Sequence, residues 1–235
     1  PLLLAYRFPA VSALVGEWLD APMDSTVIYS EKPVPRSNFI SWAQAREMKA
    51  SGLVEFASHS FAQHKAITSN PQGNVEPALS TARYDPGSAS YETPEQFRER
   101  FRADLRRNSD LIEKEIGSRP RAMVWPFGRY TLDALEVLKA EKYDFALTLN
   151  DEPGDTTLPM QIGRYLPTEN LPLSDLVTDL RFSDRFPATQ RLLSLDPAEI
   201  WSSDPAEFER RLGIALERLI TLGATGIVLQ AVSVD

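Results

Sequence analysis

The sequence predicts an α/β protein built from parallel βα units. Short apolar runs that suit buried strands alternate with amphipathic helical patterns between residues 10 and 149. Capping and stop signals bracket the helical patterns, and the composition, 43% hydrophobic and 25% charged over 235 residues, is typical of a globular chain. These observations leave open whether the units form an open sheet or a barrel. In both architectures, sites gather where strands end and loops begin.

The amino-terminal elements are short. Residues 2–6 are predicted to be the last turn of a helix, which Phe8-Pro9 ends because proline disfavours a helical residue before it. Residues 10–15 are then a candidate buried strand. Residues 20–36 are polar and contain several prolines, so we expect mostly loop there.

A helix and a strand lead to the two histidines of the chain. Ser37 or Asn38 is predicted to cap the helix, Gly52 to end it, and residues 53–57 to form the next strand. Residues 58–91 are a long polar segment, and loops of that length tend to be functional or mobile. The helix is indicated by apolar residues at spacings of three, namely Trp42, Ala45 and Met48.

The pattern then repeats with a long helix and a short strand. The segment Thr93–Gln96 combines a cap, a first-turn proline and a capping-box glutamine, and Gly117 ends the helix. Residues 122–125 are predicted to be a strand. The apolar stripe of the helix consists of Phe97, Phe101, Leu105, Ile112 and Ile116. Further expected elements are a helix at 131–142 with Leu132, Leu135 and Leu138 inward, a strand at 145–149 and a strand at 161–166.

The carboxyl-terminal part is predicted to belong to a second domain. We expect a first domain over residues 1–183, a polar linker at 184–189, and the start of the second domain over 190–235. One βαβ unit is indicated there, because an apolar strand pattern, a capped helix and another strand follow in turn. Its expected elements are residues 192–195, 204–222 and 225–231.

Charge and composition restrict the classes of partner. The net charge of -8 and the lack of a basic stretch argue against nonspecific nucleic-acid binding. The chain has no cysteine, which excludes disulfides and thiolate metal sites. The apolar opening, interrupted by Arg7 and Pro9, predicts neither a membrane span nor a signal peptide. We expect it to be the interior of a domain whose beginning lies before Pro1.

His59 and His64 are the only histidines, and they follow directly on a predicted strand. Neutral imidazole is the commonest side-chain metal ligand near neutral pH, and a catalytic metal site usually takes about three protein ligands. The pair is therefore a candidate for part of a metal site. Two unrelated histidines remain the alternative when the pair is considered alone.

The segment Trp125-Pro126-Phe127-Gly128 is a second candidate, at the end of another predicted strand. An aromatic-proline turn there could be ordinary packing. It could also form a wall against a sugar ring, with backbone amides exposed where glycine lets a ligand approach.

Together the two segments resemble the polysaccharide deacetylases of carbohydrate esterase family 4. Ser58-His59-Ser60 with His64 is similar to that family's two-histidine metal motif. The spacing of five between the histidines resembles the poly-β-1,6-N-acetyl-D-glucosamine N-deacetylases of biofilm export systems. The other similar segments are 42–47, 52–55, Lys65, 91–93, 97–100 and 124–128, with 216–219 and 226–231 similar to the opening of a glycoside-hydrolase-like second domain.

This resemblance implies a fold and a mechanism. The fold would be a distorted (β/α) barrel of NodB-like type, followed by the first βα unit of a second (β/α) barrel. One divalent transition metal (Zn, Ni, Co or Fe) would be held by His59, His64 and an aspartate. An aspartate would act as general base and a third histidine as acid, while the backbone amide of Phe127 would stabilise the oxyanion. Substrate would contact Trp125, Pro126, Phe127 and Gly128.

The chain also departs from the family pattern. The expected aspartate pair and acid histidine would precede Pro1, so the base, the acid and the third ligand are not assigned. Trp125 occupies the position where many members have an arginine, which agrees with the export subgroup.

The resemblance implies a hydrolase of linear amides that N-deacetylates poly-β-1,6-N-acetyl-D-glucosamine during biofilm exopolysaccharide export. Its partners would be the polysaccharide and an outer-membrane export porin, with no nucleic acid, and its location would be periplasmic and associated with the outer membrane. Two alternatives stay open. One is a deacetylase of peptidoglycan or chitin, and the other is a non-catalytic carbohydrate-binding module.

Overall fold

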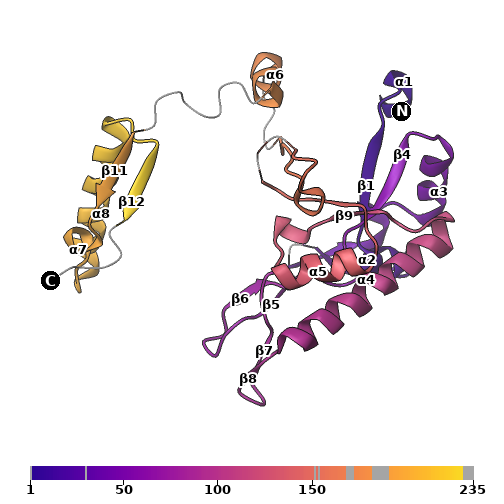
Figure 1. Ribbon diagram of the computed structural model, residues 1–235, viewed down its shortest axis with the longest axis horizontal. Coiled ribbons are helices and arrows are strands. Elements are labelled where there is room, and N and C mark those ends of the chain that lie inside the picture. Colours follow the sequence, from indigo (N-terminus) through magenta and orange to yellow (C-terminus); the bar gives the residue numbers. More distant parts are fainter. Residues whose placement is uncertain are drawn as a thin grey trace. The chain divides into compact units, whose positions relative to one another are not determined.

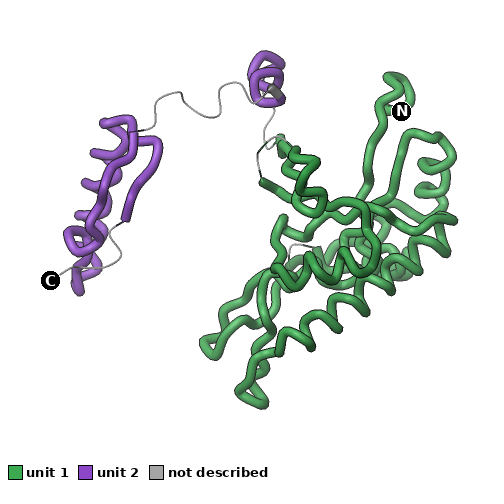
Figure 2. The backbone as a smooth tube through the Cα atoms, viewed as in Figure 1, with its two compact units in different colours: residues 1–169 green, residues 170–235 purple. Residues whose placement is uncertain are grey.

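The computed structural model describes residues 2–29, 31–150, 152, 154–167, 172–181 and 191–229. The chain divides into two compact units, residues 1–169 and 170–235 (Figure 2). The predicted linker at 184–189 lies outside the described residues, and the predicted domain limits of 1–183 and 190–235 stay a prediction.

A parallel sheet forms the centre of the first unit, which confirms the predicted α/β class (Figure 1). Its strands are ordered β1-β4-β9-β10, and Ser58 at the end of β4 pairs with both Leu14 and Met123. Within the described residues the sheet is open, so closure into a barrel stays a prediction. The strands are β1 (Ala10–Leu14), β4 (Val54–Ser58), β9 (Ala122–Val124) and β10 (Phe145–Leu147).

The longest helix begins and ends where its sequence signals predict. Thr93 Oγ1 accepts a hydrogen bond from the Gln96 amide, the Gln96 side chain accepts one from the Thr93 amide, and Gly117 closes the helix at φ 83°. The helix lies beside α5 (Figure 1). The α-helices of this unit are α1 (Leu2–Tyr6), α2 (Gly16–Asp20), α3 (Trp42–Ala50), α4 (Pro94–Ile116) and α5 (Leu132–Ala140).

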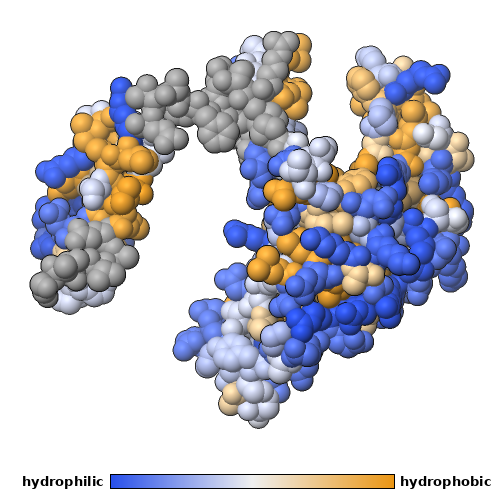
Figure 3. Space-filling view, viewed as in Figure 1, coloured by the Kyte–Doolittle hydropathy of each residue, from blue (hydrophilic) through white to orange (hydrophobic). Residues whose placement is uncertain are grey.

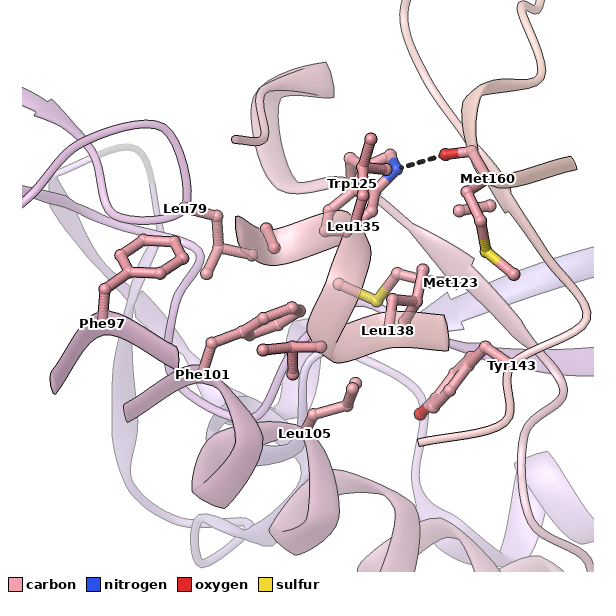
Figure 4. Packing of buried hydrophobic residues seen from close by; sticks show 13 residues of the cluster. Leu79, Phe97, Phe101, Leu105, Met123, Trp125, Leu135, Leu138, Tyr143 and Met160 are labelled. Atoms are coloured by element: carbon pink, nitrogen blue, oxygen red, sulfur yellow. Dashed lines mark hydrogen bonds between the residues drawn. The ribbon is translucent and has the colours of Figure 1, made fainter. Parts of the chain in front are cut away.

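The main core lies where α4 and α5 pack on the sheet (Figure 4). Phe101 and Leu105 of α4 are fully buried against Leu138 of α5 and Met123 of β9. Burying each such side chain stabilises the fold by about 1.5–3 kcal/mol. The prediction that Leu132 points inward is wrong: its side chain is 79% exposed, because the helical turn places it opposite the buried face of α5.

Four expectations for loops and ends are corrected. The predicted loop at 20–36 contains an antiparallel hairpin, whose prolines are tolerated because the hairpin has two edges. Ser41, and not Ser37 or Asn38, caps α3, since residues 36–38 form a short 3-10 helix. The segment 58–91 holds two further hairpins, and 161–166 forms one bridge instead of a strand. The added elements are β2 (Thr26–Tyr29), β3 (Lys32–Pro35), β5 (Ala66–Thr68), β6 (Val75–Pro77), β7 (Tyr84–Asp85), β8 (Ser90–Tyr91), and the 3-10 helices η1 (Arg36–Asn38), η2 (Pro126–Gly128) and η3 (Pro159–Gln161).

The second unit contains the predicted βαβ arrangement. Two parallel strands pair in register, and the intervening helix begins at its Asp204 cap. Apolar side chains, including Ile220 and Leu229, are exposed on this unit (Figure 3). No helix among the described residues is long and apolar enough to cross a membrane. The elements are α6 (Leu173–Arg181), β11 (Leu192–Leu195), α7 (Pro197–Ile200), α8 (Pro205–Thr221) and β12 (Gly226–Leu229).

Candidate metal centre and active site

The two candidate segments of the sequence meet at one edge of the sheet. His59 follows the last residue of β4, and Trp125 follows the last residue of β9. These strands are parallel neighbours, so their carboxyl ends lie together, at the edge where α/β sheets bind ligands. The site is therefore assembled by strand pairing between segments about 65 residues apart in the chain.

The histidine rings lie close together, with centroids 4.9 Å apart and planes inclined by 52°. The backbone amide of His59 donates to the Leu14 carbonyl of β1 at 2.9 Å. On the other side, His59 Nδ1 lies 2.6 Å from the Val124 carbonyl oxygen. A carbonyl can only accept, so Nδ1 carries the proton and Nε2 keeps its lone pair. This is the arrangement that orients a metal-binding imidazole.

Burial keeps both imidazoles neutral at pH 7. It lowers the pKa of His59 to about 4, although the hydrogen bond to Val124 acts in the opposite direction. Burial also lowers the pKa of His64. Neutral imidazole is the form that binds metal ions, so the charge state of the pair suits ligation.

The donor set fits a divalent metal ion in part. His59, directly after β4, and His64, five residues later, present two neutral imidazoles, the kind of nitrogen donor that such an ion accepts. Among the described residues, no group of three or more histidine, cysteine, aspartate and glutamate side chains is placed to hold a metal ion. The structure therefore brings the predicted ligand pair together without a third ligand, and metal binding stays a prediction.

The aromatic turn divides into a buried support and an exposed ring. Trp125 is fully buried, and its Nε1 donates to the Met160 carbonyl at 3.0 Å (Figure 4). Pro126 is also buried, whereas the side chain of Phe127 is 42% exposed and its ring centroid lies 4.3 Å from that of His64. The predicted sugar-facing wall thus narrows to Phe127 and Gly128, because the core encloses the other two side chains.

The backbone of the turn is in the left-handed region at two successive residues. Phe127 has φ 57° and ψ 12°, and Gly128 has φ 65°. A Cβ on Gly128 would lie 2.6 Å from the Cβ of Leu149, so only glycine fits there. The amides of Gly128 and Arg129 close the turn by donating to the carbonyls of Trp125 and Pro126. Neither of these bonds uses the Phe127 amide, the expected oxyanion donor.

A cleft of about 740 Å³ opens beside His64. The Trp18 ring meets the His64 ring edge-on, with centroids 5.1 Å apart, and the Phe127 ring also lies against the His64 ring. Aromatic and apolar walls with a few polar groups are typical of sites for sugars and other small ligands. The walls include Glu17, Trp18, Ile28, His64, Val75 and Phe127.

Sequence reasoning missed three groups that hold this site. One is the carbonyl of Val124, which only strand pairing brings to His59. Another is Asp104, whose carboxylate is buried beneath the loop that joins the histidines. The third is Gln63, which donates to that carboxylate. A signal for Asp104 was present, because it lies three residues after Phe101 and thus on the apolar stripe of α4.

The sheet, the histidine pair and the aromatic turn are those of an α/β carbohydrate-modifying domain, and the comparisons give its family. The polysaccharide deacetylase family model matches residues 1–146, and the chain belongs to this family.

Its relatives give finer similarities. The chain is 30% identical over 231 residues to the poly-β-1,6-N-acetyl-D-glucosamine N-deacetylase of Escherichia coli (strain K12). The match covers 98% of this chain and 34% of that protein, so the chain spans about a third of the length of this relative.

Two solved structures are also similar. A de-N-acetylase from Aggregatibacter actinomycetemcomitans matches 76% of this chain and 68% of its own, with 34% identity and a TM-score of 0.69. The BpsB deacetylase domain from Bordetella bronchiseptica matches 71% of this chain and 64% of its own, with 40% identity and a TM-score of 0.67. The predicted NodB-like deacetylase fold is thereby confirmed, apart from closure of the barrel.

Proposed function

We propose that this protein is a metal-dependent hydrolase that removes acetyl groups from poly-β-1,6-N-acetyl-D-glucosamine. The observation that carries the proposal is the pairing of His59 and His64, with the Nδ1 proton of His59 committed to Val124, beside the exposed ring of Phe127. Family membership and a relative named for this substrate support it.

The chain's own residues would take the following roles. His59 Nε2 and the His64 ring would hold a divalent cation, with zinc, nickel, cobalt and iron all suited to such nitrogen donors. When bound, a cation of this kind polarises a carbonyl and activates water. The Phe127 amide would donate to the developing oxyanion, and Phe127 and Gly128 would line the sugar site. No general acid or base is assigned among the described residues.

The cellular setting is part of the same proposal and rests on the family resemblance alone. The protein would act in the periplasm, in association with the outer membrane and with an export porin, on a polymer destined for the biofilm matrix. Co-purification of the intact protein with an outer-membrane porin, and its fractionation between periplasm and outer membrane, test this part separately.

Acetate release tests the activity. The intact protein, stripped of metal with a chelator, is assayed on β-1,6-linked N-acetylglucosamine oligomers before and after addition of Zn²⁺, Ni²⁺, Co²⁺ or Fe²⁺. We expect activity only after metal addition, and its loss in His59→Ala. Activity that survives both chelation and this substitution would defeat the proposal.

The same assay decides between the alternatives. Faster acetate release from chitin or peptidoglycan fragments than from β-1,6-linked oligomers would assign one of those polymers as the substrate. Tight binding of the polymer without acetate release under any metal condition would favour a carbohydrate-binding module.

A further inference from the structure

A buried carboxylate holds the loop between the two histidines. Asp104 lies in the middle of α4, and the residue is only 8% exposed. Its Oδ2 accepts a hydrogen bond from the Phe61 amide at 2.7 Å, and its Oδ1 accepts from the Ala62 amide at 2.7 Å and from Gln63 Nε2 at 3.1 Å. The carboxylate thus receives three donors from three consecutive residues that immediately precede His64.

The loop needs these bonds because its backbone is unusual. Ser60 has φ 69°, a left-handed conformation that is unfavourable for a residue with a side chain. Its hydroxyl accepts from the Gln63 amide at 3.1 Å, which tightens the turn further. Hydrogen bonds to a carboxylate are shorter and stronger than those between neutral groups, and Asp104 accepts three of them. They are strong enough to keep the loop in this shape.

The carboxylate is the inner end of a longer chain of polar contacts. Gln63 Oε1 accepts from Arg100 Nη1 at 2.7 Å. Arg100 in turn binds both carboxylate oxygens of Glu92, at 2.7 and 2.8 Å. Since Asp104 and Arg100 lie one turn apart on α4, the helix presents both groups to the loop. We call Asp104, Gln63, Arg100 and Glu92 the Asp104 network.

We propose that Asp104 is a positioning residue for the metal site. By fixing the amides of Phe61 and Ala62, it holds the two histidine rings with their centroids 4.9 Å apart before any cation binds. The inference rests on the proposed function, because it concerns the metal ligands named there. Loss of the carboxylate would let the loop relax, and each bound cation would then have to order His64. Changes to groups that orient metal ligands typically lower metal affinity by about 10–100-fold.

The test compares Asp104→Asn with Ser109→Ala in the intact protein. Ser109 is a matched control because it is buried on the same helix, where its hydroxyl contacts Tyr143 and not the loop. Cobalt(II) affinity is measured by titration of the metal-free protein, followed by its visible absorption. Hydrogen exchange of the Phe61 and Ala62 amides is measured without metal.

We expect Asp104→Asn to raise the dissociation constant for cobalt about 10–100-fold. Protection of the Phe61 and Ala62 amides should fall, because asparagine keeps one acceptor oxygen and replaces the other with an NH2 group, which cannot accept a hydrogen bond. Ser109→Ala should leave both unchanged, even where it lowers the melting temperature. We expect kcat to fall with little change in KM, since the substrate contacts are intact.

Each outcome of the test has one interpretation. A cobalt affinity of Asp104→Asn within threefold of the wild-type value overturns the positioning role while leaving the proposed function in place. Failure of the wild-type protein to bind cobalt overturns the proposed function itself, and the positioning role with it. If Asp104→Asn does not fold, Gln63→Leu decides: we expect a loss of cobalt affinity of about threefold or more, and an unchanged value overturns the inference.

Discussion

His59 Nδ1 donates to the carbonyl oxygen of Val124 across 2.6 Å, so the end of one strand orients the ring carried by its neighbour. Val124 is the last residue of β9, and the aromatic turn starts directly after it. The same peptide segment therefore fixes the tautomer of the first histidine and places Phe127 beside the second. The histidine pair and the turn therefore form one structural unit.

Phe127→Gly should reduce activity without destabilising the fold. The ring is 42% exposed, so little burial is lost, and glycine relieves the left-handed backbone at φ 57°. We expect the free energy of unfolding to stay within about 1 kcal/mol of wild type, because the two effects oppose each other. KM for oligosaccharides should rise, since the sugar-facing ring is gone. Denaturant unfolding and steady-state kinetics check both, and an unchanged KM would remove Phe127 from the sugar site.

Trp125→Phe should destabilise the fold and have a smaller effect on KM. The indole is fully buried, and its loss leaves the Met160 carbonyl without its donor. We expect a loss of stability of about 1–3 kcal/mol, measured by urea unfolding, from the unsatisfied carbonyl. KM should change less than in Phe127→Gly, because the ring does not reach the surface. A large increase in KM with unchanged stability would restore Trp125 as a direct substrate contact.

Gly128→Ala tests the fit of the turn, with Gly52→Ala as its control. Both glycines have positive φ, 65° and 71°. A Cβ at Gly128 would meet Leu149 at 2.6 Å, whereas nothing lies within 4 Å of one at Gly52. We expect about 1 kcal/mol of destabilisation at Gly52 from backbone strain alone, and clearly more at Gly128. Equal losses in urea unfolding would show that the contact with Leu149 is relieved without cost.

Glu92→Gln should remove a pH-dependent part of the stability. Burial alone would raise the pKa of Glu92, but hydrogen bonds from Arg100 and from the Arg83 amide outweigh it, and the pKa is lowered from 4.5. The unfolded state then binds more protons than the folded state just below pH 4.5. The stabilisation from the Glu92 carboxylate is therefore complete above that pH, and it is lost as the pH falls through the pKa of Glu92 in the folded state.

We therefore expect Glu92→Gln to lower the free energy of unfolding by about 1–3 kcal/mol at pH 7. This range lies between the values for exposed and buried ion pairs, because the side chains of Glu92 and Arg100 are 10% and 12% exposed. The difference from wild type should shrink as the pH falls below 4.5. Urea unfolding as a function of pH measures it. Glu113→Gln, which breaks the exposed pair with Arg119, is the control and should change stability by less than about 1 kcal/mol. A Glu92→Gln difference that stays constant as the wild-type carboxylate is titrated below pH 4.5 would contradict the pKa shift.

The sequence was most informative where local signals agree with packing. The cap at Thr93 and the stop at Gly117 gave both ends of α4, because each acts within one turn of helix. The hairpin at 26–35 was missed, since its short strands contain prolines and pair only with each other. The cap of α3 was misplaced because Ser37 and Ser41 are chemically alike, and only the 3-10 turn at 36–38 decides between them.

The site was predictable only as separate pieces. The motifs around His59 and Trp125 were visible, but their contact depends on the order of strands in the sheet. The division of the turn into a buried Trp125 and an exposed Phe127 depends on left-handed backbone that no pattern of side chains reveals. Asp104 was not singled out in the sequence, because its donors are backbone amides of a distant loop.

His59 and His64 should bind one cation together. Anomalous diffraction at the absorption edge of the metal, from crystals of the intact protein soaked in cobalt or zinc, locates that cation. We expect a single anomalous peak at bonding distance, about 2.0–2.1 Å for zinc, from His59 Nε2 and from a ring nitrogen of His64. No peak between the two rings at saturating metal, or a peak bound to neither histidine, would contradict it.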